Sequence, residues 1–308
     1  MNKTLEFNQL YEKADDLFER KAYQIALDLI NSALSIDTFI PPKRLFEAYL
    51  LRADIQIHMK KYAYGISDCR EAIKIDPLSP RGFSLRAFAL SKTEQDELAI
   101  KDLDEALRLD PHSYIDFYNR GLANFSLSKY ESAISDCNES IRLNPSHSES
   151  FSLRGSSSYY LEKKIEALKD LNIAIQYDSK NSVAFYYRGV LKRKLEIYQE
   201  SIEDLTKAIQ IDPSVASYFY QRGLSYKSLG QDEEARKNFF VSGKIGLSID
   251  KVKLLDEITA NANTALKFNN RYSKLKVWER ITITFINLIK KRLYRFKLIS
   301  ISENKTYK

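Results

Sequence analysis

The chain has 308 residues, about the length of two ordinary domains, with only 9 Gly and 7 Pro against 44% apolar and 29% charged residues. So few breakers favour helices joined by short turns, while 20 Tyr and 16 Phe argue against disorder and no apolar run is long enough to suggest a membrane span. The net charge of +7 is uneven: residues 271–308 carry +9 and residues 1–270 carry −2, so the basic character belongs to the C-terminal end.

The first expected unit, residues 7–40, is a pair of helices with an irregular sequence. Leu10 and Ala14 stand at places that later units fill with an aromatic residue and a glycine or alanine. An insertion containing Pro41 and Pro42 separates this unit from the next one. Because proline restricts the backbone, we expect a rigid, slightly irregular connection there.

From residue 46 onward the sequence repeats with a period of about 34 residues. An Arg followed by Gly or Ala recurs at every interval, at Arg52, Arg86, Arg120, Arg154, Arg188 and Arg222. Prolines close several units at Pro77, Pro111, Pro145 and Pro213, each after Asp or Asn. A single helix pair cannot bury its apolar face, so neighbouring pairs must stack. The predicted units are 7–40, 46–79, 80–113, 114–147, 148–181, 182–215 and 216–249.

This pattern resembles the tetratricopeptide repeat. The aromatic residue of its first helix corresponds to Tyr49, Phe83, Phe117, Phe151, Phe185 and Phe219. The small residue at the helix contact corresponds to Ala53, Ala87, Gly121, Gly155, Gly189 and Gly223. The resemblance implies an all-α, right-handed α-solenoid of about seven helix pairs over residues 1–249, which serves as a scaffold for protein interactions.

Five units also carry an Arg in the first helix and an Asp in the second, sixteen residues later. The pairs are Arg52/Asp68, Arg86/Asp102, Arg120/Asp136, Arg154/Asp170 and Arg188/Asp204. Residues at this separation can meet within a helix pair or across to its neighbour. We predict a ladder of Arg–Asp contacts whose role is to fix the register of the fold.

Catalytic motifs are not found. There is no Gly-rich phosphate loop, GxSxG, HExxH or CxxC. Cys69 and Cys137 occupy equivalent apolar positions and are expected to be buried, and His58, His112 and His147 are isolated from one another. We therefore expect a non-enzymatic protein with no catalytic residue, cofactor, metal or small-molecule substrate. With no visible signal peptide, the expected location is cytoplasmic.

In the tetratricopeptide-repeat family, the surface lined by the first helices commonly holds extended peptides or partner helices. Carried over by position, the candidate groove residues here are Phe88, Tyr118, Asn119, Leu122, Phe125, Tyr159, Tyr160, Tyr186, Tyr187, Arg193, Lys194, Tyr220 and Lys227. Leu153, Ser156 and Val190 fall on the same side. The N-terminal end of this surface is acidic, through Glu12, Asp15 and Asp54, and its C-terminal end is basic. The tyrosines suit a recognition surface, but any one of them could instead pack against a neighbouring first helix.

One known use of the family is disfavoured. Repeats that hold the C-terminal carboxylate of heat-shock chaperones share a clamp of two Lys, two Asn and one Arg across three repeats. Asn119 fits one of these positions, but the flanking positions hold Leu, Ser, Tyr and Val. We therefore expect no chaperone-tail binding of that type.

The C-terminal end divides into two predicted segments. Residues 250–270 are expected to form an amphipathic capping helix. In the basic segment 271–308, apolar residues follow helical spacing, and the candidate contact residues are Trp278, Phe285, Lys290, Lys291, Arg292 and Arg295. Such a helix could pack on the solenoid, dock on a partner, lie on an anionic membrane surface as a tether for an assembly or adaptor factor, or bind nucleic acid. Nucleic acid is the least favoured, because RNA-binding motifs are missing.

Overall fold

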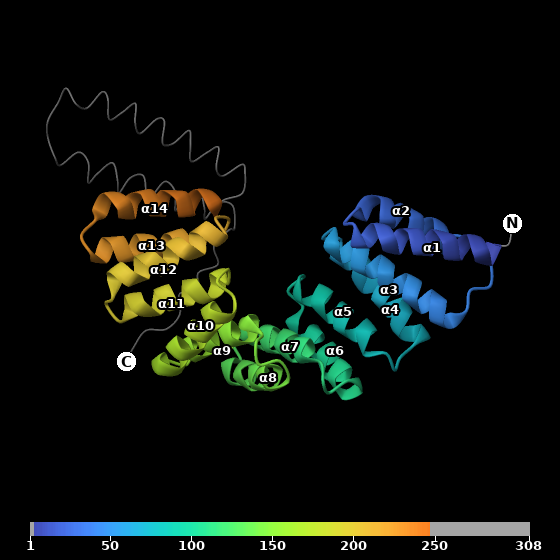
Figure 1. Cartoon of the computed structure of the whole chain (residues 1–308), viewed down its shortest axis with the longest axis horizontal. Coiled ribbons are helices and arrows are strands. Elements are labelled where there is room, and N and C mark those ends of the chain that lie inside the picture. Colours follow the sequence, from blue (N-terminus) through green and yellow to red (C-terminus); the bar gives the residue numbers. More distant parts are fainter. Residues whose placement is uncertain (1–2, 247–308) are drawn as a thin grey trace, which may run out of the picture. The chain divides into compact units, whose positions relative to one another are not determined.

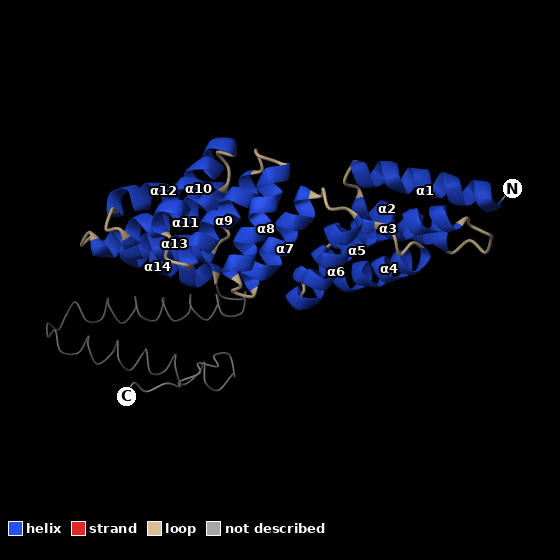
Figure 2. Ribbon diagram, turned by 90° about the horizontal axis from the view of Figure 1, so that it is seen from below, coloured by secondary structure: helices blue, strands red, loops and turns tan. Residues whose placement is uncertain are grey.

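A computed structural model of the chain describes residues 3–246, and every regular element in that range is an α-helix (Figures 1 and 2). The helices are α1 (Lys3–Glu19), α2 (Tyr23–Leu34), α3 (Pro42–His58), α4 (Tyr62–Ile75), α5 (Pro80–Ser91), α6 (Asp96–Leu109), α7 (Tyr114–Ser126), α8 (Tyr130–Leu143), α9 (Ser148–Tyr160), α10 (Lys164–Tyr177), α11 (Ser182–Lys194), α12 (Tyr198–Ile211), α13 (Ala216–Ser228) and α14 (Asp232–Ile245). The predicted all-α solenoid of about seven helix pairs is confirmed. The predicted segments 250–270 and 271–308 lie outside the described residues.

The helices form two kinds of layer. Each odd-numbered helix packs against the even-numbered helix that follows it, and that helix also packs against the next odd-numbered one. Odd-numbered helices contact one another along the whole series, from α1 and α3 to α11 and α13. Figure 1 shows these pairs following one another in chain order. We call the odd-numbered helices the first-helix layer.

Small residues allow the two helices of a pair to approach closely. At Gly155 on α9, an added Cβ would lie 2.9 Å from Leu171 Cγ and 3.2 Å from the Ala167 carbonyl oxygen on α10. Ala167 and Leu171 are themselves fully buried. A side chain at residue 155 would therefore push the two helices apart, which explains the small residue that recurs at this place from repeat to repeat.

The turn inside each pair contains a residue in the left-handed backbone region, and the sequence did not predict it. Positive φ angles between 59° and 72° occur at Lys21, Lys60, Glu94, Ser128, Glu162, Glu196 and Gly230. Next to each of them, a backbone N–H closes a six-residue turn, as from Lys129 N to Asn124 O at 2.8 Å. This is the Schellman ending of a helix, where glycine is usually favoured. Only the last pair has glycine there.

The predicted Arg–Asp ladder is present in all five pairs. Each arginine donates hydrogen bonds to the aspartate sixteen residues later, as from Arg154 Nε and Nη2 to Asp170 at 2.8 Å. The equivalent contacts are Arg52–Asp68, Arg86–Asp102, Arg120–Asp136 and Arg188–Asp204, at 2.6 to 3.0 Å. In the seventh pair, Arg222 donates to Asn238 instead. Each carboxylate is buried, so the pairs join the two helices of a repeat at fixed register.

The same arginines also bind the preceding repeat. Nη1 of Arg154 donates to Asn138 Oδ1 on α8 at 2.7 Å, and Nη1 of Arg188 donates to Asn172 Oδ1 on α10 at 2.7 Å. Arg52, Arg120 and Arg222 make the corresponding bonds to Asn31, Asp104 and Thr206. For Arg86 the corresponding residue is Arg70, which has no side-chain acceptor. The junction between the second and third repeats therefore lacks this bond.

Candidate functional site

The predicted partner-binding residues all lie in the first-helix layer, on α5, α7, α9, α11 and α13. Phe88, Tyr160 and Tyr220 are the most exposed aromatic residues among them, at 39%, 47% and 48%. Lys194 and Lys227 are also exposed. The half-buried members are Tyr118, Asn119, Leu122, Phe125, Tyr159, Tyr186, Tyr187 and Arg193.

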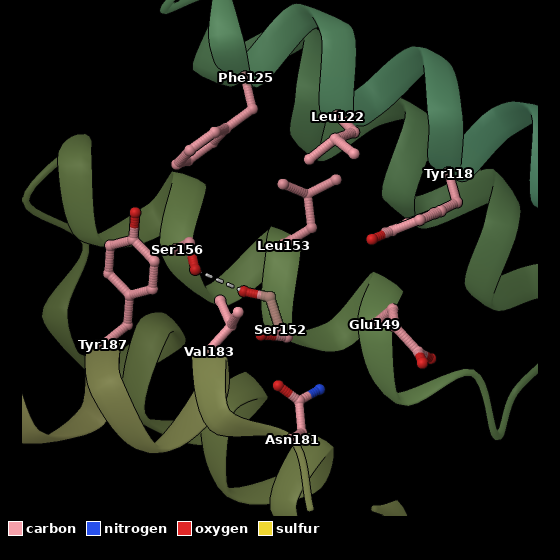
Figure 3. Close-up of a pocket in the computed structure, with 10 residues that line it drawn as sticks. All are labelled: Tyr118, Leu122, Phe125, Glu149, Ser152, Leu153, Ser156, Asn181, Val183 and Tyr187. Atoms are coloured by element: carbon pink, nitrogen blue, oxygen red, sulfur yellow. Dashed lines mark hydrogen bonds between the residues drawn. The ribbon is translucent and has the colours of Figure 1, made fainter. Parts of the chain in front are cut away.

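A cavity of about 180 Å³ lies between α7, α9 and α11 (Figure 3). Its lining residues are Tyr118, Leu122, Phe125, Glu149, Ser152, Leu153, Ser156, Asn181, Val183 and Tyr187. Four of these, Tyr118, Leu122, Phe125 and Tyr187, are candidate groove residues from the sequence, and Leu153 and Ser156 were expected on the same side. Apolar and aromatic side chains dominate the wall, and they come from three successive repeats.

The cavity exists because α9 carries serines where its neighbours carry large side chains. Ser152 is equivalent by the repeat register to Tyr118 on α7 and Tyr186 on α11. Ser156 is equivalent in the same way to Leu122 and Val190. Both serines are buried, at 4% and 1% exposure. Their small volume leaves space that the flanking aromatic and aliphatic side chains then enclose.

Four lining residues were missed by the prediction: Glu149, Ser152, Asn181 and Val183. The repeat register alone would have found one of them, since Ser152 lies one full repeat after the predicted Tyr118. Their residue types gave no reason to select them. A single glutamate, serine, asparagine or valine does not stand out in a sequence, and the importance of these four residues comes from the space they border.

The tyrosines divide into packed and accessible rings. Tyr187 lies against Phe125, Tyr159, Tyr160 and Tyr186, with centroid separations of 4.9 to 6.4 Å. Burial raises the pKa of Tyr187. Tyr160 stacks on Tyr130 at 4.8 Å but leaves nearly half of its surface exposed. Both sequence interpretations thus apply: Tyr187 supports neighbouring first helices, whereas Tyr160 offers a ring to solvent.

The Tyr118 ring, which lines the cavity, packs against His147. The His147 ring lies edge-on to Tyr114 and Tyr118, each at 5.1 Å between centroids. Its Nδ1 lies 2.7 Å from Ser150 Oγ and its Nε2 lies 3.3 Å from the Glu149 carboxylate. Burial lowers the pKa of His147, and burial raises the pKa of Tyr118 to about 12. Tyr118 is therefore held as a neutral ring at the cavity wall.

The two ends of the surface differ in charge, but less simply than the sequence indicates. At the N-terminal end, Arg44 pairs with Glu12 and Glu47, and Arg81 lies 3.4 Å from Asp54. These arginines offset part of the predicted acidity. At the C-terminal end, Lys194 lies 4.3 Å above the Tyr159 ring and 3.5 Å from Glu162. Tyr220 packs on Phe239 of α14, with 5.5 Å between ring centroids.

Cys69 and Cys137 are free and fully buried, as expected, and burial raises the pKa of the Cys69 thiol to about 12. Within residues 3–246, no helix has the length and apolar character needed to cross a membrane. The predicted contacts of the basic segment, from Trp278 to Arg295, lie outside the part of the chain that the structure describes.

Comparison with known proteins gives three kinds of likeness. A DnaJ homolog subfamily C member 7 homolog from Dictyostelium discoideum is 32% identical over 89 residues, which cover 29% of this chain and 16% of that protein. A crystal structure of a tetratricopeptide repeat protein from Parabacteroides merdae superimposes with a TM-score of 0.67 at 17% identity, covering 83% of this chain and 99% of the other. The structure of the APC/C hetero-tetramer Cut9–Hcn1 gives a TM-score of 0.62 at 16% identity, covering 80% of this chain and 55% of that chain.

The stacked pairs and the continuous first-helix layer define a helical-repeat solenoid. Family models described as the tetratricopeptide repeat match residues 46–77, 116–147 and 216–239. These matches fall on the second, fourth and seventh pairs. The chain is a tetratricopeptide-repeat protein.

Proposed function

We propose that this protein is a non-catalytic interaction scaffold that binds a peptide or helix of a partner protein on its first-helix layer. The observation that carries the proposal is the apolar cavity between α7, α9 and α11, with the exposed Tyr160 next to it. Concave, mainly apolar sites with a few polar groups are the usual form of binding sites in proteins. A structure of the same fold, Cut9–Hcn1, is described as a hetero-tetramer, which is consistent with a protein partner.

The cavity suits a side chain of a partner better than a free metabolite. Its wall offers aromatic and aliphatic groups from three repeats, and Glu149 is the one charged residue among those that line it. Aromatic anchors around a small pocket are typical of the places where protein interfaces concentrate their binding energy. The rest of the layer then contributes contact area along successive helices.

A charge placed in the cavity mouth tests the proposal. Val183 lines the cavity, is 45% exposed and is the second residue of α11. Val183→Glu puts a carboxylate against the incoming apolar group. The fold tolerates the change, because an acidic residue in the first turn of a helix is electrostatically favourable.

Ile165 provides the matched control. It is 82% exposed and is the second residue of α10, on an even-numbered helix. Proteins bound by the wild type and by Ile165→Glu, but not by Val183→Glu, in quantitative affinity purification from the native cell would support the proposal. Partners that all survive Val183→Glu would show that the cavity is not the binding site.

A further inference from the structure

We propose, on the basis of the function just proposed, that the groove selects a partner segment with an apolar side chain followed by an acidic one. The apolar side chain fills the α7–α9–α11 cavity, and the acidic side chain binds Arg193 near the end of α11. Three features of this surface support that pairing: the volume of the cavity and, within residues 3–246, the Ser152 hydroxyl that lacks a partner and the unpaired guanidinium of Arg193.

The cavity has room for one side chain. An apolar protein cavity of about 150 Å³ accommodates a benzene molecule, so 180 Å³ can hold one aromatic ring or one branched aliphatic side chain. Leu122, Leu153 and Val183 supply aliphatic walls, and Tyr118, Phe125 and Tyr187 supply rings. An acidic side chain would lose its hydration there without gaining a cationic partner, because no Lys or Arg lines the cavity.

A polar group inside this apolar site also points to a ligand. The Ser152 hydroxyl is shielded from solvent and has no hydrogen-bond partner among the described residues, although Ser152 lines the cavity. The Ser156 hydroxyl, by contrast, is satisfied by the Ser152 carbonyl at 2.7 Å (Figure 3). A buried hydroxyl without a partner is unfavourable.

Arg193 differs from the other half-buried arginines in the described range. Those arginines each donate to a side chain: Arg44, Arg52, Arg86, Arg120, Arg154, Arg188 and Arg222. The Nε of Arg193 is shielded from solvent and has no hydrogen-bond partner within residues 3–246, and no carboxylate of that range lies at ion-pair distance. A guanidinium in this state favours a carboxylate, which can accept two parallel hydrogen bonds.

The charge around Arg193 favours the same ligand. The two lysines that flank Arg193 in the sequence already have acidic partners: Lys194 lies 3.5 Å from Glu162, and Lys192 lies 3.0 Å from Glu200. Lys227 is exposed on the next odd-numbered helix. The C-terminal part of the first-helix layer therefore presents more cations than its own acids neutralise, and an acidic partner segment complements it.

The spacing between the two sites follows from helix geometry. Arg193 lies six residues after Tyr187 on α11, which is about 9 Å along the helix axis. Arg193 also lies about 120° around the helix axis from Tyr187, so this rise is the smallest separation of the two sites. An extended peptide advances about 3.3 Å per residue, so at least about three residues separate the apolar and acidic positions. Arg193 also lies one helical turn after Val190, whose equivalents on α7 and α9 line the cavity, so the two sites share one side of the layer.

The test uses the full-length protein and a displayed library of random peptides. We expect enriched peptides to share an apolar residue and an Asp or Glu at least about three residues apart. A selected peptide should bind Arg193→Gln about tenfold more weakly than wild type, whereas the same peptide with Asp→Asn or Glu→Gln should bind both proteins equally. Arg70→Gln, which changes an exposed arginine on α4, should bind like wild type. Thermal unfolding of each variant separates lost binding from lost folding.

Three results would overturn the inference, and they are distinguishable. The first result is a set of peptides that carry no acidic residue, fail to bind Val183→Glu and bind Arg193→Gln as tightly as wild type. It would support the groove as a binding site and would refute the acidic position. Peptides that bind Val183→Glu and Arg193→Gln unchanged would remove the groove function as well. Binding of a single-stranded oligonucleotide that needs Arg193, with no enriched peptide, would assign the cationic end to nucleic acid.

Discussion

The junction between the second and third repeats should be strengthened by Arg70→Asn. At the equivalent position of later repeats, Asn138 and Asn172 accept a hydrogen bond from the arginine of the following repeat at 2.7 Å. Arg86 already lies in the right register, since its Nε and Nη2 bind Asp102. An asparagine at residue 70 would offer its side-chain oxygen as an acceptor to Nη1 of Arg86. The change would also remove the positive charge of Arg70, which has the same sign as that of Arg86.

The expected gain is modest because residue 70 is exposed. A hydrogen bond from a charged donor contributes about 1.5–3 kcal/mol when it is sheltered. Competition with water and loss of side-chain freedom reduce this to about 0.5–1 kcal/mol at the surface. For a fold of this size, such a gain raises the melting temperature by about 1–4 °C.

Hydrogen exchange gives a local measurement, which suits a repeat protein whose stability is a sum over neighbouring units. Amides of α4 and α5 should exchange about two- to fivefold more slowly in Arg70→Asn, while those of α11 and α12 should be unchanged. Asn138→Arg, which removes the equivalent bond to Arg154, should produce the opposite change in α8 and α9. If Arg70→Ala protects α5 as well as Arg70→Asn does, relief of charge repulsion is responsible and the hydrogen-bond argument is wrong.

Three further substitutions test two other physical features of the solenoid. Ser128→Gly should stabilise the protein by about 0.5–1 kcal/mol in urea unfolding, because Ser128 holds a φ of 59° that glycine adopts without steric cost. Gly230→Ala, at φ 72°, should destabilise the protein by a similar amount. If both variants unfold at the same urea concentration as the wild type, these positions are not strained. Asp116 is 3% exposed, and burial raises its pKa above the usual 3.8, so the folded state binds its proton more tightly than the unfolded state. Stability should therefore decline as pH rises from about 3.8 through the folded pKa, and Asp116→Asn should flatten that decline; an unchanged profile would refute it.

The fold could be predicted from the sequence because the same weak pattern recurs in repeat after repeat. One Arg or one Gly carries little information, but the pair formed by Arg154 and Gly155 has a counterpart in each repeat from the second to the seventh. The register also predicted which side chains meet, as Arg154 and Asp170 show. The left-handed residues escaped, because lysine, glutamate and serine at those positions give no sign of a positive φ. Tertiary context imposes that backbone conformation on residues with no local preference for it.

The candidate site was harder to predict, because a cavity is defined by what is missing. Tyr118 and Leu122 could be selected as large groups on the right helix side. Ser152 and Ser156 could not be recognised as cavity-forming, since their importance lies in being smaller than the residues one repeat away. Likewise, Arg193 reads as one more basic residue in a run of three, and only the structure shows that Lys192 and Lys194 have acidic partners while Arg193 does not.

The arginines illustrate how repetition separates structural from functional residues. Arg52, Arg86, Arg120, Arg154 and Arg188 occupy one repeat position, share one kind of partner and account for the register of the stack. A residue needed for folding should recur, because every repeat solves the same packing problem. Arg193 occupies a position filled by Tyr159 and Lys227 in the adjacent repeats, and no packing requirement common to the repeats explains its half-buried guanidinium. A departure from the repeat that is also unsatisfied within residues 3–246 is the feature most expected at a surface shaped for a partner.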